Sequence, residues 1–576
     1  MEYPLLKALR RYRQTVSAFR GYNRNDRIGD GEFAHMENMT SDCYPLLSPR
    51  KRRGSYAAVA ASGLIAKDSL CHVEGSRFVM NGYGVDMGLS QGEKQLVGMG
   101  AYVIILPDKK YINTRDLTDW GDLDARFTTE GKVKLTLCNA EGEVYSLQHA
   151  PGAGEPASPQ NLDLWIDTAQ SPHVLKQWSE ATGLWVRVDS TYVRIENPGL
   201  GKAFSQYDGI TLSGLGATEA AALEGSAVVW QKGEDYIVVT GLLDKPLELD
   251  TPVTAERAMP EMDFVVESEN RLWGCRYGLD AQGRVVNELY ASKLGDFKNW
   301  RCYMGLSTDS YAASLGSDGP FTGAVTHLGY PIFFKEHCMH KVYGNLPENF
   351  QVQTTACRGV QPGCHRSLAV VGETLFYKAT GGILAYDGSL PREVSQALAG
   401  EKYERAAAGA VDNKYYVSMA DGQGQWQLLV YDTARGLWHR EDGLHVTAFC
   451  CCRGELYAAT EDGILALLGS GEAAEARVRW LAETGPWLME LPERKYVACL
   501  DVGLSMEADA RVRILVAYDL DGQWEPVWTL ESRHLRNLSV PIRPRRCDHF
   551  RLRLEGEGVV KLYGITRILE KGSDLR

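Results

Sequence analysis

The sequence lacks the short motifs that mark most enzyme and metal sites. It has no C-x-x-C pair and no G-x-S-x-G turn around a nucleophilic serine. Its one approach to a phosphate loop, PGLGKAF, has neither the upstream glycine nor the Ser or Thr that must follow the lysine. We therefore predict a protein with no cofactor and no enzymatic activity.

A group of histidines and cysteines invites a metal interpretation without fitting one. Its spacing matches no zinc pattern, and residues that alternate along a strand do not converge on one ion. We predict ordinary strand residues at Cys338 and His340, and packed thiols at Cys450, Cys451 and Cys452. We predict no metal site among His337, Cys338, His340, Cys357, Cys364 and His365.

Long hydrophobic runs are missing too. No window approaches the roughly 18 apolar residues of a membrane-spanning helix, and the start MEYPLLKALRRYR lacks the apolar core of a secretory signal. The 13 cysteines follow no disulfide framework, which fits reduced thiols. These absences predict a protein that is made in the cytoplasm and has no membrane span.

What the sequence does contain is a repeat. Residues 367–468 hold three near-copies of one unit, in which Leu375, Tyr415 and Leu456 occupy equivalent places at steps of 40 and 41 residues. Ile332 lies 43 residues before Leu375, and Leu272 lies 60 residues before Ile332. A period of about 40 to 50 residues with about four short strands is typical of a propeller blade. We predict an all-β fold built on a β-propeller of about seven blades, with six or eight as alternatives.

The repeat also divides the chain. Blade-like units stop near residue 120 and resume near residue 257, and longer alternating strands with one charged face fill the last hundred residues. The predicted parts are an N-terminal arm with a ring-closing strand (1–53), early blades (54–120), an inserted β-rich domain (121–256), the remaining blades (257–470) and a C-terminal β-sandwich (471–576).

The N-terminal arm has helical periodicity. Leu5, Leu9, Tyr12, Val16 and Phe19 follow spacings of four and three, with basic residues between them. This pattern predicts a short basic amphipathic helix over residues 4–19.

Positive charge is local in an acidic chain. The net charge of −12 argues against a nucleic-acid-binding surface over the whole protein, yet residues 1–53 hold eleven Lys and Arg against six Asp and Glu. Two basic clusters are candidate contacts with DNA or with an acidic partner, and the alternative is that they are solvated turn residues. The candidates are Arg50, Lys51, Arg52, Arg53, Arg543, Arg545 and Arg546.

Several stretches resemble β-propeller structural proteins of tailed bacteriophages and prophages. They are FRGYNRNDRIGDGEFAHMENMTSDCYPLLSPRKRR, NRLWGCRYG with NELYASKLGDFKNW, LGYPIFFKEHCMHKVYG, and TLFYKATGGILAYDG. The resemblance is to the tail hub, nozzle or DNA-stabilisation type. It implies a non-enzymatic virion protein that forms a homo-oligomeric ring, contacts portal, adaptor or tail components, and lies close to packaged DNA.

Two other functions stay open. In a glycan-binding propeller, aromatic residues such as Trp273, Trp300 and Trp438 would line open pockets. In a glycan-cleaving propeller, a pair of carboxylates would lie at the mouth of the ring, where sequence spacing gives no indication of them. The repeated S-x-D-x-G-x-x-W turns of sialidase-type propellers are missing.

Overall fold

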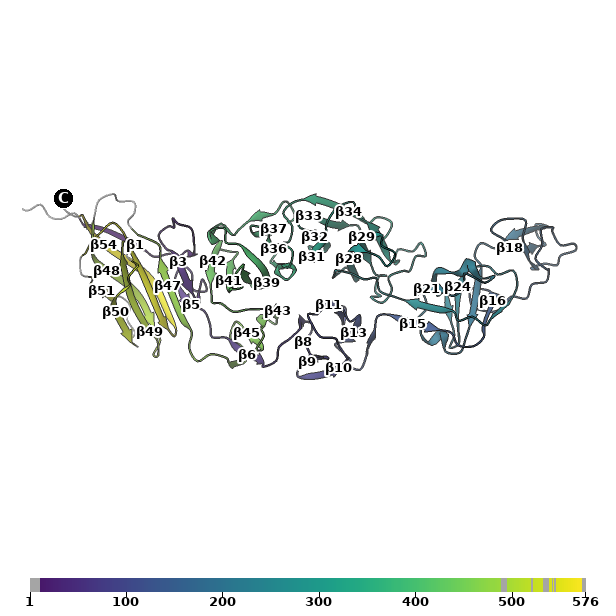
Figure 1. The fold of residues 1–576 in the computed structure, drawn as a ribbon, viewed down its shortest axis with the longest axis horizontal. Coiled ribbons are helices and arrows are strands. Elements are labelled where there is room, and N and C mark those ends of the chain that lie inside the picture. The colour runs from purple at the N-terminus through teal and green to yellow at the C-terminus, as the bar shows by residue number, and fades with distance from the viewer. Residues whose placement is uncertain are drawn as a thin grey trace, which may run out of the picture.

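The computed structural model describes residues 11–487, 495–519, 522–531, 538–540, 542 and 545–571. Three β-rich parts lie in a row: a two-sheet sandwich at one end, a propeller in the middle and an inserted domain at the other end (Figure 1). The predicted fold class is therefore confirmed. No helix in the described ranges is long and apolar enough to cross a membrane.

The propeller has seven blades, each an antiparallel sheet of four or five strands. Blades 1 and 2 precede the inserted domain, and blades 3 to 7 follow it. Blade 1 consists of β7 (Gly63–Ala66), β8 (Leu70–Glu74), β9 (Arg77–Met80) and β10 (Tyr83–Asp86), and blade 2 of β11 (Gln95–Met99), β12 (Tyr102–Leu106), β13 (Lys110–Asn113) and β14 (Trp120–Asp122). Blade 3 consists of β27 (Phe264–Ser268), β28 (Arg271–Leu279), β29 (Val285–Ala291) and β30 (Tyr311–Ser314), blade 4 of β31 (Phe321–His327), β32 (Tyr330–Lys335), β33 (Cys338–Tyr343) and β34 (Gln351–Ala356), and blade 5 of β35 (Ala369–Val371), β36 (Thr374–Ala379), β37 (Gly382–Tyr386) and β38 (Arg392–Glu393). Blade 6 consists of β39 (Tyr403–Val411), β40 (Lys414–Asp421), β41 (Trp426–Asp432) and β42 (Leu437–Arg440), and blade 7 contains β43 (Ala448–Cys452), β44 (Glu455–Ala459) and β45 (Ile464–Ala466).

The repeat positions coincide with the second strand of each blade from blade 3 onward. Leu272, Ile332, Leu375, Tyr415 and Leu456 lie in β28, β32, β36, β40 and β44, and each is fully buried. A blade buries both faces against its neighbours, so these side chains fill equivalent interfaces. Short 3-10 helices, η3 (His365–Ser367) and η4 (Gln396–Leu398), lie in two of the connections.

A strand from the N-terminal side closes the ring. β6 (Gly54–Ala57) pairs antiparallel with β45 of blade 7 and with β46 (Glu472–Ala473). Gly54 is required there, because a Cβ would lie 1.7 Å from the carbonyl oxygen of Ser470. This pairing adds a strand from before blade 1 to blade 7 and so joins the two ends of the ring.

The inserted domain carries three sheets between blades 2 and 3. Gly209 and Tyr207 of this domain hydrogen-bond the side chain of Asn299 in blade 3, at 3.1 and 2.6 Å, and so dock the domain on the propeller. The sheets are β15 (Ala125–Thr128), β26 (Thr254–Arg257), β21 (Gly209–Ser213) and β22 (Gly225–Val228); β23 (Gln231–Lys232), β24 (Tyr236–Thr240), β20 (Tyr192–Glu196), β16 (Val133–Cys138) and β25 (Leu247–Leu249); β17 (Leu164–Asp167), β18 (Val174–Ser179) and β19 (Leu184–Arg187), with the 3-10 helices η1 (Leu200–Lys202) and η2 (Ala221–Leu223).

The sandwich is built from both ends of the chain. N-terminal strands add to each of its two sheets, and a small hairpin of β4 (Met39–Thr40) and β5 (Ser48–Pro49) leads on to the ring. The sheets are β1 (Arg11–Val16), β54 (Val560–Lys571), β48 (Lys495–Met506), β51 (Leu538–Val540) and β52 (Arg546–Cys547); and β2 (Gly21–Tyr22), β3 (Glu32–Glu37), β47 (Arg479–Thr484), β53 (Phe550–Glu557), β49 (Arg511–Tyr518) and β50 (Glu525–Glu531).

The predicted N-terminal helix is wrong. Within the part of residues 4–19 that is described, β1 pairs antiparallel with β54, and Tyr12 lies opposite Leu569. Only Val16 of this strand is buried, so the helical spacing of apolar residues does not correspond to a buried face. Residues 4–10 lie outside the described residues.

One hydrophobic core continues from the sandwich into the propeller. It joins Val502 and Leu552 of the sandwich to Phe376 and Trp438 of blades 5 and 6, through Tyr22 and Phe33 of the N-terminal strands. The two parts are therefore packed together, with no flexible linker between their cores.

Candidate functional site

A cavity of about 550 Å³ lies on the propeller axis, at the end where the first strands of the blades begin. Each of the seven blades supplies at least one residue to its wall: Leu64, Leu96, Phe264, Ala324, Leu368, Ala408 and Phe449. We call this cavity the mouth. A concave site at the point where all the blades converge is the usual place for a ligand in a ring of this kind.

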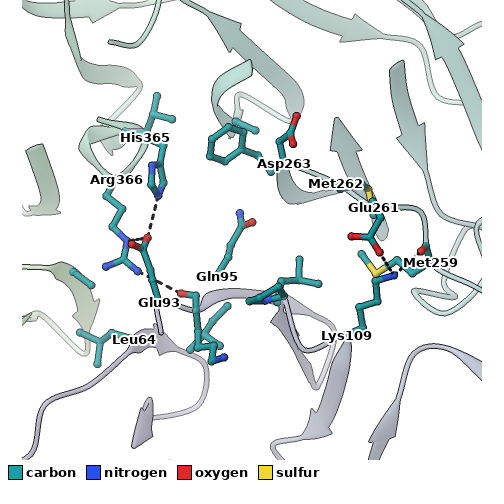
Figure 2. Close-up of a pocket in the computed structure, with 18 of the residues that line it drawn as sticks. Leu64, Glu93, Gln95, Lys109, Met259, Glu261, Met262, Asp263, His365 and Arg366 are labelled. Atoms are coloured by element: carbon teal, nitrogen blue, oxygen red, sulfur yellow. Dashed lines mark hydrogen bonds and ion pairs between the residues drawn. The ribbon is translucent and has the colours of Figure 1, made fainter. Parts of the chain in front are cut away.

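One wall of the mouth carries a linked acid, imidazole and guanidinium. Glu93, two residues before β11, accepts hydrogen bonds from His365 Nε2 at 3.2 Å and Arg366 Nε at 2.7 Å (Figure 2). The hydrogen bond from His365, followed by the charge of Arg366, holds the pKa of Glu93 below its ordinary value. Glu93 is therefore an ionised carboxylate at neutral pH.

Arg366 also ties three blades together. Its guanidinium donates to the carbonyl oxygen of Thr447 at 2.6 Å and to that of Lys94 at 3.4 Å. These carbonyl groups precede β43 and β11, whereas Arg366 itself precedes β35. The wall is thus fixed by contacts across the ring, which pre-organises its charged groups.

Two more carboxylates lie away from Glu93 in the mouth (Figure 2). Glu261 pairs with Lys109 Nζ at 2.7 Å, and the same ammonium donates to the carbonyl oxygen of Met259 at 3.0 Å. Asp263 accepts from Arg276 at 3.2 Å and from the backbone N–H of Tyr277 at 2.8 Å. The mouth therefore presents acids on opposite sides of one hollow.

The mouth is balanced in charge and partly apolar. Its three carboxylates face Lys109, Arg366 and the buried Lys94, whose ammonium is paired with Asp108 at 2.6 Å. Phe264 and Met262 add apolar surface, and the Phe264 ring lies 5.3 Å from the His365 ring. Because the cations are already paired, the site suits an uncharged ligand rich in hydroxyl groups better than an anion.

The basic candidates near residue 50 divide into two kinds. Arg50 and Arg53 are 8% and 5% exposed, and they pair with Glu441, Asp442 and Glu475 at the junction of propeller and sandwich. Their assignment as DNA contacts is corrected, because the guanidinium groups are buried and paired. Lys51 and Arg52 are exposed, so for them the assignment stays a prediction.

The C-terminal basic candidates are less informative. Arg545 is exposed and pairs with Glu525 at 2.7 Å, and Arg546 begins β52. Arg543 lies outside the described residues. Neither Arg545 nor Arg546 lines the mouth.

The histidine and cysteine group forms no metal centre in the described part of the chain. Cys338 Sγ lies 3.6 Å from His340 Nε2, and that nitrogen also bonds Ser317 Oγ at 2.9 Å, so the imidazole is satisfied within the blade. All 13 cysteines are free thiols. Cys452 is buried, but Cys451 is exposed, so the prediction of a packed thiol is wrong for Cys451. His365 has a different place, in the wall of the mouth.

The three tryptophans named for a glycan platform fill the core. Trp273, Trp300 and Trp438 are 3%, 2% and 2% exposed. The indole N–H of Trp300 donates to the carbonyl oxygen of Phe297, and that of Trp438 to Val394, so these rings serve packing.

Sequence reasoning missed the residues that line the mouth. Glu93, Glu261, Asp263 and Arg366 follow no common motif, and they lie up to 273 residues apart along the chain. One signal was present: each stands within three residues of the first strand of a blade. In a propeller those starts meet on the axis, so charged residues at the starts of repeats are candidates for the mouth.

Comparisons with known proteins find solved structures of low identity and low TM-score. No family model and no curated protein matches the chain. Matching solved structures include BamB from Moraxella catarrhalis (9% identity, TM-score 0.31, 75% of this chain and 97% of that one). An acylaminoacyl peptidase from Pyrococcus horikoshii matches at 11% identity and TM-score 0.23, over 51% of this chain and 50% of that one. A glycoside hydrolase family 43 arabinoxylan arabinofuranohydrolase from Bacillus subtilis matches at 8% identity and TM-score 0.19, over 52% of this chain and 94% of that one.

These matches correct one prediction. Several are glycoside hydrolases, so the expectation that the chain is not an enzyme is overturned and is not kept. The likenesses are too weak to assign an activity to this chain. The resemblance to phage propeller proteins, with its virion location and partners, stays a prediction.

Proposed function

We propose that the protein binds an uncharged oligosaccharide in the mouth of the propeller and cleaves it there. The observation that carries the proposal is the placement of Glu93 on one side of the cavity and of Glu261 and Asp263 away from it (Figure 2). Glycoside cleavage uses two carboxyl groups that flank the scissile bond, one as acid and one as base or nucleophile. The apolar side chains of Phe264 and Met262 would lie against the sugar ring.

The surroundings assign different roles to the two sides. Glu93 is kept ionised by His365 and Arg366, which suits a base or nucleophile. The proton for the leaving oxygen would then come from the other side, from Glu261 or Asp263. Arg366 and His365 act on Glu93 and are positioning residues in this scheme.

The experiment is a screen of neutral polysaccharides and oligosaccharides for binding and for release of new reducing ends. Glu93→Gln should lower turnover at least about 100-fold while leaving binding within a few-fold, and so should one of the two variants Glu261→Gln and Asp263→Asn, because proton transfer and nucleophilic attack need the carboxyl group. Glu248→Gln is the matched control, since Glu248 is an exposed partner of Lys132 in the inserted domain and should retain full activity. Binding without turnover would support the proposed glycan binding and contradict the proposed cleavage.

A second candidate, an assembly role, is favoured by the shape of the molecule. The sandwich and the inserted domain project from opposite ends of the propeller, so each is available to a different neighbour (Figure 1). The test is the native mass of the purified protein with class averages from electron microscopy. A closed ring of copies would support the assembly role, and a monomer that cleaves glycans would contradict it.

A further inference from the structure

An aromatic stack lies on the same face of the propeller as the mouth. The Trp426 ring, at the first position of β41, stacks on the His445 ring with centroids 3.8 Å apart and an interplanar angle of 17°. The guanidinium of Arg405 lies 5.6 Å from the centre of the indole. His445 belongs to the connection between blades 6 and 7, so the stack bridges two blades.

A second hollow adjoins this stack. It has a volume of about 300 Å³, and its wall includes His445, Thr460, Glu461 and Asp462. His445 Nδ1 lies 3.3 Å from Glu461 Oε1, and the side chain of Glu461 is 79% exposed. The hollow therefore offers carboxylate oxygens as hydrogen-bond acceptors beside an aromatic surface.

The two hollows are joined by a short length of chain. His445 borders the second hollow, and Ala448 borders the mouth. Three residues of extended chain span at most about 10 Å, so the two sites are within reach of one short oligosaccharide. The Gly463 turn and the start of β43 lie on the same side of blade 7, because β43 and β44 are antiparallel and Ala448 is paired with Ala459.

We propose that the Trp426–His445 stack and the hollow beside it form an outer subsite for further units of a linear, uncharged oligosaccharide held in the mouth. This inference rests on the proposed function. The flat C–H face of one sugar unit would lie against the indole in place of the exposed Arg405 side chain. Hydroxyl groups of a neighbouring unit, in the hollow beside His445, would donate to Glu461 and Asp462.

The subsite predicts a dependence of affinity on chain length. For linear xylo-oligosaccharides and cello-oligosaccharides, from disaccharide to hexasaccharide, affinity should rise with length until the outer subsite is filled. Trp426→Ala should weaken binding of the long members about tenfold and leave the disaccharide unchanged, because a buried aromatic contact is a typical binding hot spot. The measurement is titration calorimetry on the full-length protein.

Trp120→Ala is the matched control. Trp120 is 39% exposed, carries the Lys110 ammonium 6.0 Å from its ring, and lies on the outermost strand of blade 2. Its removal should change no affinity. Equal affinity for all lengths, with Trp426→Ala unchanged, would overturn the outer subsite and leave the proposed function standing. Absence of binding by every oligosaccharide would overturn the proposed function and the subsite with it.

Discussion

Replacing Arg53 with methionine is expected to destabilise the protein by about 3 kcal/mol, because the substitution leaves the buried Glu441 and the partly exposed Asp442 without their main partner. Arg53 donates to Glu441 at 2.8 Å and to Asp442 at 2.7 Å, and Glu441 is only 5% exposed. Arg50 lies 3.5 Å from the same Glu441 carboxylate and compensates part of the loss. The measurement is the unfolding midpoint in urea or by heating.

Arg52→Met is the control for this prediction. Arg52 is exposed and donates a single hydrogen bond, to the carbonyl oxygen of Ala476 at 3.3 Å, so its loss should change stability by less than about 0.5 kcal/mol. The double variant Arg53→Met/Glu441→Leu should recover much of the stability, since the unpaired charge is removed as well. A normal midpoint for Arg53→Met together with weaker DNA binding would show instead that Arg53 serves nucleic acid.

The ring was predictable because its signal is periodic. Leu375, Tyr415 and Leu456 recur at nearly constant steps, and each fills the same place between blades. A repeated interface leaves a repeated residue type, and this needs no knowledge of distant contacts. The alternation of charged and apolar residues in the last hundred residues revealed the sandwich for the same reason.

The N-terminal strand was not predictable from local spacing. Helical periodicity around Tyr12 and Val16 is a local property, whereas β1 is held by Thr15 opposite Thr566 and its neighbours, more than 550 residues away. Pairing with β54 overrides the local preference. The local excess of positive charge led to the wrong assignment of Arg50 and Arg53 as DNA contacts for the same reason, because their acidic partners near residue 441 are far along the chain.

The residues that line the mouth were not predictable from the sequence, and the reason is geometric. Glu93, Glu261 and Arg366 line the same cavity only when the ring closes, and β6 closes the ring by pairing with β45. A carboxylate pair at the mouth was an open alternative, but sequence spacing does not determine which acids reach the axis. The fold class was therefore readable, and the site required the structure.

Acidification from pH 7 to pH 4 is expected to destabilise the protein, and we expect His439 to cause a measurable part of this loss of stability. His439 lies on β42, is 2% exposed, and has no hydrogen-bond partner on either ring nitrogen within the described residues. Burial, and then the charge of Lys414, lowers its pKa to about 3. An unfolded histidine titrates near pH 6.5, so between these values the unfolded state binds the extra proton, and stability falls as the pH falls.

The surroundings of His439 offer a new cation little compensation. The carboxylate of Asp432 already accepts from Ser41 at 2.6 Å and from Arg435 at 2.9 Å, and Asp42 is paired with Lys414. Gly21 of β2 approaches so closely that an added Cβ would lie 3.3 Å from His439 Cε1. A charged imidazole would therefore be buried at the contact between the propeller and the N-terminal strands of the sandwich.

His439→Leu should flatten the fall of the melting temperature between pH 7 and pH 4, although the variant loses some packing at every pH. Part of the fall will persist, because burial also lowers the pKa of His340, to about 4. His337→Leu is the control, since the His337 side chain is exposed in the fold, and it should leave the slope unchanged. An unchanged slope in His439→Leu would mean that other groups cause the acid sensitivity. A flattened slope, with proteolysis at low pH confined to the segment between β1 and β6 in the wild type, would place the weak point at the junction of propeller and sandwich.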